Sequence, residues 1–250
     1  ILTGIIGITV LFVIFLEGRF AIAAAVILLS LWGTKEYVAM HEKNENHSRS
    51  AIVYPAAIFL VATTFFGIET FKCNLLYGSL LLVFLGLAID ALVRGPGEFL
   101  SHFKTEFLAI FYVPFLLAHL LLFKLPSFSE LQPFNIIWFV LITTWATDIG
   151  AFFIGTYLGK TKLAPKISPN KTIEGAAGGM FCGLLAAIIF VYLIKLPLRM
   201  FLPLGFVLPL AGQIGDLYES GLKRNLACKD SGTFFPGHGG VLDRIDSLLF

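Results

Sequence analysis

The sequence predicts an all-α protein, a polytopic bundle of about eight or nine transmembrane helices. Of its 250 residues, 57% are hydrophobic and only 14% are charged, and the mean hydropathy is +0.87. A water-soluble core cannot bury so much apolar surface, so lipid must solvate much of the chain. The apolar segments are long and uniformly apolar, whereas the strands of a membrane barrel alternate between apolar and polar residues.

The expected helices follow one another along the chain as apolar segments at residues 1–16, 20–34, 51–68, 75–93, 106–123, 135–158, 173–194, 199–217 and from about 241 onward. A span needs about 20 residues. The first two segments are shorter, and they are expected to form a clipped span followed by a tilted one, or a hairpin. The polar loop at 41–50 is expected to be an ordinary solvated connection.

We expect residues 1–250 to form one integral-membrane domain, with both ends trimmed, because the chain begins without methionine and stops within an apolar run. Loop charge predicts its orientation, since Lys and Arg near helix ends stay on the cytoplasmic side. The even-numbered loops hold twelve of these residues and the odd-numbered loops hold five. The even loops, including the polar stretch at 220–246, are therefore expected to face the cytoplasm.

The remaining composition is less specific. A net charge of +2 gives no support for nucleic-acid binding. The three cysteines are far apart and lack the spacing of a disulfide framework or a zinc site. On the seventh segment, Gly175, Gly179 and Gly183 share one helix face and favour close packing within the chain over a subunit interface. The sequence is compatible with a homodimer but does not require one.

Polar residues that could do chemistry gather in a predicted catalytic region at 148–246, where five of the six aspartates lie. Carboxylates are costly inside a bilayer, at about 2.5–3.5 kcal/mol near its centre. Asp216 and Glu219 are three residues apart, as are Asp243 and Asp246, so each pair shares a helix face. Two acidic pairs suit a hard cation such as magnesium. The basic residues that could instead pair with these acids are Lys223, Arg224 and Arg244.

Glycines in the PGHGG stretch at 236–240 leave backbone N–H groups open to an anion. With lysines and arginines nearby, phosphate is the anion that fits best. Acids for a metal and bases for phosphate together indicate metal-assisted phosphoryl or nucleotidyl transfer. His238 either contacts phosphate, donates a proton or orders its own loop.

A second polar block at 159–175 is expected on the same membrane face. Its lysines either hold a triphosphate or anionic lipid headgroups, or anchor the adjacent helices at the membrane surface. These lysines are Lys160, Lys162, Lys166 and Lys171. Asp148 lies in the middle of an apolar segment and is expected to face a wet cavity or a polar partner. A purely structural hydrogen bond is the competing interpretation for Asp148.

The stretch 220–246 closely resembles the signature of the phosphatidate cytidylyltransferases, also called CDP-diacylglycerol synthases. The residues that carry the resemblance are Ser220, Leu222, Lys223, Arg224, Lys229, Asp230, Pro236, His238, Gly239, Gly240, Asp243, Arg244 and Asp246. The block SPNKTIEG at 168–175 resembles the second polar motif of the family. The chain departs from the family pattern at Ile149, where threonine is usual, and at Phe152, where tyrosine is usual.

The resemblance implies a nucleotidyltransferase of phospholipid biosynthesis, in which the phosphate of phosphatidic acid attacks the α-phosphorus of CTP to give CDP-diacylglycerol and pyrophosphate. It implies that Asp216 and Asp243 hold magnesium with a second cation, which can be magnesium or monovalent, and that Asp246 supports them. Lys223 and Arg224 would neutralise phosphates during catalysis. The residues expected to bind substrate are Lys229, Asp230, His238, Gly239, Gly240, Arg244, Ser168, Lys171 and Asp148.

The implied location is the bacterial inner membrane, with the site facing the cytoplasm and the lipid entering laterally between helices. Two other functions fit the same residues. A CTP-dependent lipid-alcohol kinase would release CDP and a phosphorylated alcohol. An ion-coupled transporter would use Asp148 near the midplane as its coupling residue and would consume no CTP, but no inverted repeat is evident.

Overall fold

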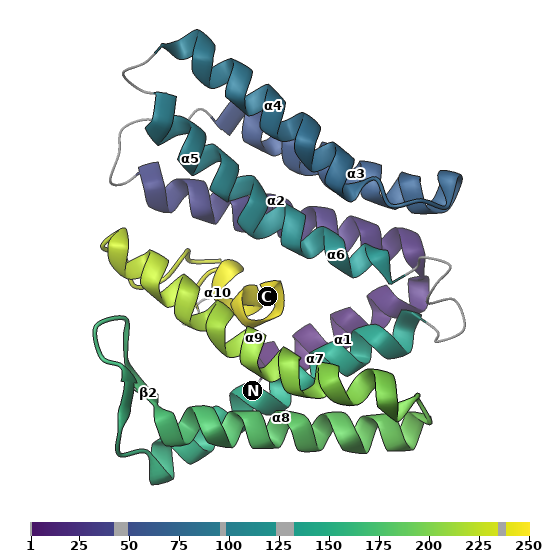
Figure 1. Ribbon diagram of the computed structural model, residues 1–250, viewed down its shortest axis with the longest axis vertical. Coiled ribbons are helices and arrows are strands. Elements are labelled where there is room, and N and C mark those ends of the chain that lie inside the picture. The colour runs from purple at the N-terminus through teal and green to yellow at the C-terminus, as the bar shows by residue number, and fades with distance from the viewer. Residues whose placement is uncertain (1, 43–49, 96–98, 124–132, 235–238) are drawn as a thin grey trace. The chain divides into compact units, whose positions relative to one another are not determined.

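A computed structural model of the chain describes residues 2–42, 50–95, 99–123, 133–234 and 239–250. It divides into two compact units, Ile1–Ser129 and Glu130–Phe250, which Figure 1 shows as ribbons coloured along the chain. Helix dominates both units, so the predicted all-α bundle is confirmed. Seven helices in the described part are long and apolar enough to cross a membrane: Arg19–Glu42, Ile52–Phe71, Leu76–Val93, His102–Leu122, Asn135–Leu158, Ile173–Ile194 and Leu198–Asn225.

The first unit contains α1 (Leu2–Glu17), α2 (Arg19–Glu42), α3 (Ser50–Phe71), α4 (Leu76–Arg94), α5 (Phe99–Ile110), η1 (Phe111–Phe115) and α6 (Leu116–Leu122). Helix α2 has 24 residues, so it is longer than the apolar segment at 20–34. The part beyond residue 34 includes the buried residues Glu36, Tyr37, Val38 and Met40. Most of the predicted solvated loop at 41–50 lies outside the described residues.

A π-helical turn, η1, joins α5 and α6 into one span. Pro114 lies inside this turn. Proline has no N–H to donate to the carbonyl four residues earlier, and its ring crowds that carbonyl, so a wider turn relieves the conflict. The rings of Phe107, Phe111 and Phe115 stack in sequence across it, with centroids 5.7 and 4.9 Å apart.

The second unit contains α7 (Pro133–Leu158), β1 (Lys162–Ala164), β2 (Ser168–Thr172), α8 (Ile173–Ile194), α9 (Leu198–Asn225) and α10 (Leu242–Leu249). The strands form an antiparallel hairpin with Lys162 opposite Thr172 and Ala164 opposite Ser168. This hairpin occupies the polar block at 159–175, for which the sequence predicted no strands. It extends beyond the N-terminal end of α8 (Figure 1).

Glycines on α8 let α7 approach closely. A β-carbon at Gly179 would lie 2.8 Å from the carbonyl oxygen of Thr147, and one at Gly175 would lie 2.9 Å from that of Ala151. These distances are too short for a real side chain, so both positions require glycine. Gly183 faces Thr147 and Pro209 of α9 in the same way. The predicted intramolecular role of this glycine face is therefore confirmed.

The start of α8 is fixed by two local interactions. Thr172 caps the helix, because its Oγ1 accepts a hydrogen bond of 3.1 Å from the N–H of Gly175. Glu174, in the first turn, accepts hydrogen bonds from the N–H groups of Lys160 and Thr161, both at 3.1 Å. These contacts hold the base of the hairpin against α8 and so position strand β2.

Candidate active site

A cavity of about 1040 Å³ lies within the second unit. Helices α7, α9 and α10 and strand β2 contribute to its walls, together with the stretch that follows α9. Its size is at the upper end of the range for small-molecule sites, roughly 300–1,000 Å³. Five carboxylates and four basic residues are among its lining residues: Asp148, Asp216, Asp230, Asp243, Asp246, Lys171, Lys223, Lys229 and Arg244.

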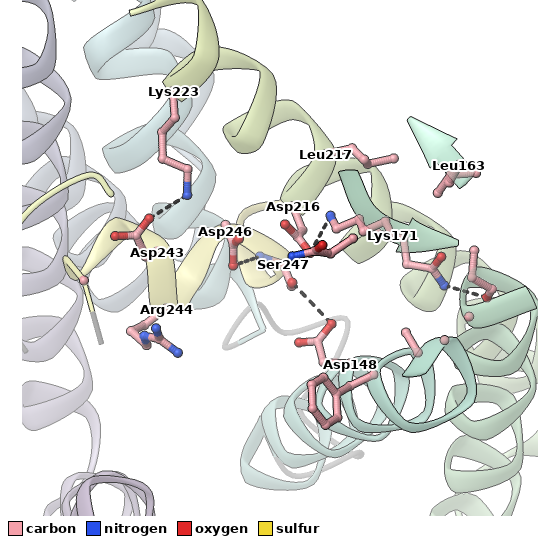
Figure 2. A pocket seen from close by; sticks show the side chains of 18 of the residues that line it. Asp148, Leu163, Lys171, Asp216, Leu217, Lys223, Asp243, Arg244, Asp246 and Ser247 are labelled. Atoms are coloured by element: carbon pink, nitrogen blue, oxygen red, sulfur yellow. Dashed lines mark hydrogen bonds and ion pairs between the residues drawn. The ribbon is translucent and has the colours of Figure 1, made fainter. Parts of the chain in front are cut away.

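Two close ion pairs connect elements that are distant in the sequence. Lys171 on β2 places its Nζ 2.6 Å from Oδ2 of Asp216 on α9. Lys223, near the end of α9, places its Nζ 2.6 Å from Oδ1 of Asp243 on α10 and 3.3 Å from Oε1 of the fully buried Glu219. Figure 2 shows both pairs facing the cavity. Lys223 therefore pairs with two of these acids, as the ion-pair alternative expected for this one residue.

Asp243 also organises the loop that precedes α10. Its Oδ2 accepts hydrogen bonds from the N–H of Gly240 at 2.7 Å and from both the N–H and the hydroxyl of Ser231 at 2.9 Å. Burial acts to raise the pKa of Asp243, but the hydrogen bonds from Lys223, Gly240 and Ser231 and the charge of Lys223 outweigh it. The pKa of Asp243 therefore lies below its ordinary value, and the carboxylate is ionised at neutral pH.

The pKa of Asp246, in contrast, lies above its ordinary value. Burial raises its pKa, and the nearby charge of Asp216 raises it further. Its Oδ1 accepts a hydrogen bond of 2.8 Å from the N–H of Ser247. The hydroxyl of Ser247 in turn donates to Oδ1 of Asp148 at 3.4 Å. Asp148 thus faces the cavity and has a polar partner, and three carboxylates lie in one region with Lys171 as a nearby cation (Figure 2).

The carboxylates supply the oxygen donors that magnesium prefers, but their present arrangement does not form a metal site. Among the described residues, no three His, Cys, Asp or Glu side chains come together closely enough to hold a metal ion. Both oxygens of Asp243 are engaged by hydrogen-bond donors. Lys171 pairs with Oδ2 of Asp216 at 2.6 Å, whereas Oδ1 accepts only a long hydrogen bond of 3.5 Å from the hydroxyl of Ser220, so Lys171 competes with a cation for one of the two oxygens.

The structure brings most of the predicted site residues together. Those that line the cavity are Asp148, Lys171, Asp216, Lys223, Lys229, Asp230, Gly239, Asp243, Arg244 and Asp246. Gly240 contributes its N–H to Asp243 instead of lining the cavity. Ser168 lies on β2 outside the lining, and Arg224 is exposed and donates from Nε to the carbonyl of Ile167 at 3.3 Å. His238 lies outside the described residues.

Several functional neighbours were missed from the sequence. Ser231 and Ser247 each directly follow a predicted aspartate, so their positions beside Asp230 and Asp246 were a usable signal. Gln213 lies three residues before Asp216, on the same face of α9. It lines the cavity and donates from Nε2 to the carbonyl of Ala176 on α8 at 3.1 Å. The polar residues flanking each motif therefore complete the site.

Comparison with known proteins identifies relatives. Residues 1–250 match the family model described as the cytidylyltransferase family. The phosphatidate cytidylyltransferase of Staphylococcus aureus (strain COL) is 48% identical over 114 residues, which are 45% of this chain and 44% of the relative. That of Bacillus subtilis is 51% identical over 116 residues, 46% of this chain and 43% of the relative. The matched part thus spans less than half the length of these curated relatives.

These bacterial relatives and the seven apolar helices identify an integral membrane protein. The names of these relatives support neither the lipid-alcohol kinase nor the transporter that the sequence also allowed.

Proposed function

Because this chain belongs to the cytidylyltransferase family, we propose that it transfers CMP from CTP to phosphatidic acid, producing CDP-diacylglycerol and pyrophosphate. The names of its relatives support this substrate pair. The observation that carries the proposal is the single cavity in which Lys171 and Lys223 are held by Asp216 and Asp243. Joining two polyanionic substrates requires cationic groups at the phosphates, and in this cavity carboxylates hold the two lysines in place.

The reaction forms one bond and breaks one bond at phosphorus. An oxygen of the lipid phosphate attacks the α-phosphorus of CTP, and the bond from this phosphorus to the bridging oxygen of the β-phosphate breaks, so that pyrophosphate leaves. Lys171, Lys223 and Lys229 line the cavity from different elements and would neutralise the phosphate charges. Cationic groups that are in position once the substrates are bound stabilise a transition state without reorganising during the chemical step.

The cavity also has an apolar side that suits the lipid. Phe152, Leu163 and Leu217 are among its lining residues, and they would contact the glycerol and first methylene groups of phosphatidic acid. We place this site at the cytoplasmic membrane face, because the lysine-rich loops are expected there. Soluble CTP and a lipid that enters between helices could meet at such a boundary.

Magnesium remains part of the proposal, with a monovalent ion or a second magnesium beside it. When bound, it would neutralise phosphate charge and polarise the phosphorus centre. Asp216 would hold it once Lys171 had turned to a substrate phosphate. Asp243 fits this role poorly in the present arrangement, because donors engage both of its oxygens. Exchange of the Lys171–Asp216 ion pair would free the second oxygen of Asp216 for the cation.

The direct test is to supply membranes carrying the full-length protein with radiolabelled CTP, phosphatidic acid and magnesium, and to separate the lipid products. We expect the wild type to form CDP-diacylglycerol and Asp216→Asn to lose about 100-fold or more of this activity. The control Glu17→Gln should keep normal activity, because Glu17 is exposed and distant in sequence from the residues of the site. Phosphorylated lipid with CDP, and no CDP-lipid, would instead identify a kinase and refute the proposal.

A further inference from the structure

The hairpin at residues 159–172, here called the basic hairpin, carries charge that the proposed mechanism does not use. Lys160, Lys162 and Lys166 are all exposed. Two apolar residues of the same hairpin, Leu163 and Ile167, each have 37% of their surface exposed. A segment that displays both ammonium groups and large apolar side chains matches the boundary between lipid headgroups and acyl chains.

The membrane-spanning helices fix the depth of the basic hairpin. It begins where the span ending at Leu158 stops, and it ends where the span starting at Ile173 begins, so both of its ends emerge at one membrane boundary. Near its turn, the carbonyl of Ile167 accepts the hydrogen bond from Arg224, which lies next to the end of a third span at Asn225. Base and turn are thus both tied to the ends of spans.

This attachment keeps the hairpin close to the headgroup layer, which is roughly 5–8 Å thick on each side of the bilayer. A hairpin that projected into solution would lack the contact between its turn and Arg224 at the end of the neighbouring span. Glu174 adds a second restraint at the base through its hydrogen bonds to the N–H groups of Lys160 and Thr161. These contacts hold the basic hairpin beside the ends of the spans.

We propose that the basic hairpin binds the headgroups of anionic lipids and thereby gathers such lipids at the mouth of the cavity. Lysines near a membrane surface are attracted to anionic lipids, and three of them lie within seven residues here. The same hairpin contributes Leu163 and Lys171 to the cavity lining, so a lipid held by the exposed lysines would lie beside the site. Lipid binding stands by itself, whereas substrate gathering rests on the proposed function.

The first test measures lipid binding without catalysis. The three natural cysteines are replaced by serine, and the exposed Pro165 in the turn is changed to cysteine and labelled with an environment-sensitive fluorophore. The protein is placed in nanodiscs of phosphatidylcholine, with or without about 30 mol% phosphatidylglycerol. Quenching by acrylamide, which is neutral, reports how far the turn enters the lipid surface.

We expect anionic lipid to reduce the quenching constant about twofold in the protein with all its lysines, and to have no effect in K160Q/K162Q/K166Q, because the attraction is electrostatic. A matched control, K35Q/K104Q/K195Q, removes three exposed lysines elsewhere and should keep the response. Equal responses of the hairpin variant and the parent, or no response to anionic lipid in the parent, would overturn the proposal and leave the lysines as topology anchors.

The second test measures substrate gathering by varying the surface fraction of phosphatidic acid at constant CTP. K160Q/K162Q/K166Q should raise the KM for surface phosphatidic acid about threefold to tenfold while keeping kcat, because the lysines act before the chemical step. An unchanged KM would refute gathering. If no protein forms CDP-lipid yet the label responds to anionic lipid, the proposed function fails and lipid binding stands.

Discussion

Replacing Asp243 with asparagine tests whether this carboxylate anchors its loop as well as serving the reaction. The carboxylate accepts four hydrogen bonds, from Lys223, Gly240 and twice from Ser231. An amide keeps one acceptor oxygen and presents an NH₂ group to the remaining donors. Hydrogen bonds to charged groups contribute about 1.5–3 kcal/mol and neutral ones about 0.5–1.5 kcal/mol, so the loop should lose about 2–4 kcal/mol.

Hydrogen exchange measures this loss directly at the amides of Ser231 and Gly240. A change of about 2–4 kcal/mol corresponds to exchange roughly 30-fold to 1,000-fold faster, if local opening controls exchange. Asp230→Asn is the control, because Asp230 is exposed and should leave both amides unchanged. If Asp243→Asn abolishes activity while both amides keep their protection, the hydrogen bonds of Asp243 do not hold the loop and our reasoning is wrong.

Three further predictions concern packing, charge and cation access. Gly179→Ala should lower the free energy of unfolding by about 1–3 kcal/mol, measured by thermal unfolding in detergent. The control Gly86→Ala should not destabilise the protein, because nothing lies within 4 Å of its added β-carbon. Equal unfolding midpoints for the two variants would contradict the packing argument. Because the pKa of Asp246 is raised in the folded state, this carboxyl group destabilises the fold at every pH above its unfolded-state pKa of about 3.9. Asp246→Asn should therefore raise the unfolding midpoint at pH 7, and the gain should vanish below about pH 4. A gain that persists there would refute this reasoning. Without CTP, Lys171→Gln should bind Mn²⁺ to the apo protein several-fold more tightly, measured by electron paramagnetic resonance, because the lysine no longer competes for Asp216; weaker binding would exclude that competition.

Hydropathy was sufficient to predict the helices, because a membrane segment must satisfy every backbone group internally and be apolar along its length. It misplaced the end of α2, where Glu36, Tyr37 and Val38 are buried beyond the apolar segment, a fact that no local pattern contains. It also gave no indication of the hairpin around Lys162. Short strands there depend on one pairing register and on the cap at Thr172, not on apolar periodicity.

The residues of the site could be named from their clustering and from the family resemblance, because carboxylates and lysines are too costly in a membrane chain to be scattered without a role. Their partners could not be named. The pairing of Lys171 with Asp216 joins a strand to a helix 45 residues later, and only the packing of α8 against α9 brings them together. The opposite pKa shifts of Asp243 and Asp246 likewise come from neighbours in space.

The sequence by itself determined the helical membrane class and predicted most of the polar residues that line the cavity, because both follow from the free energy of placing each side chain in lipid. Only the tertiary structure decided which lysine holds which carboxylate, that Arg224 reaches the hairpin at Ile167, and that the hairpin lies at the ends of three spans. Such contacts depend on distances between helices, which are set by close packing at residues such as Gly179.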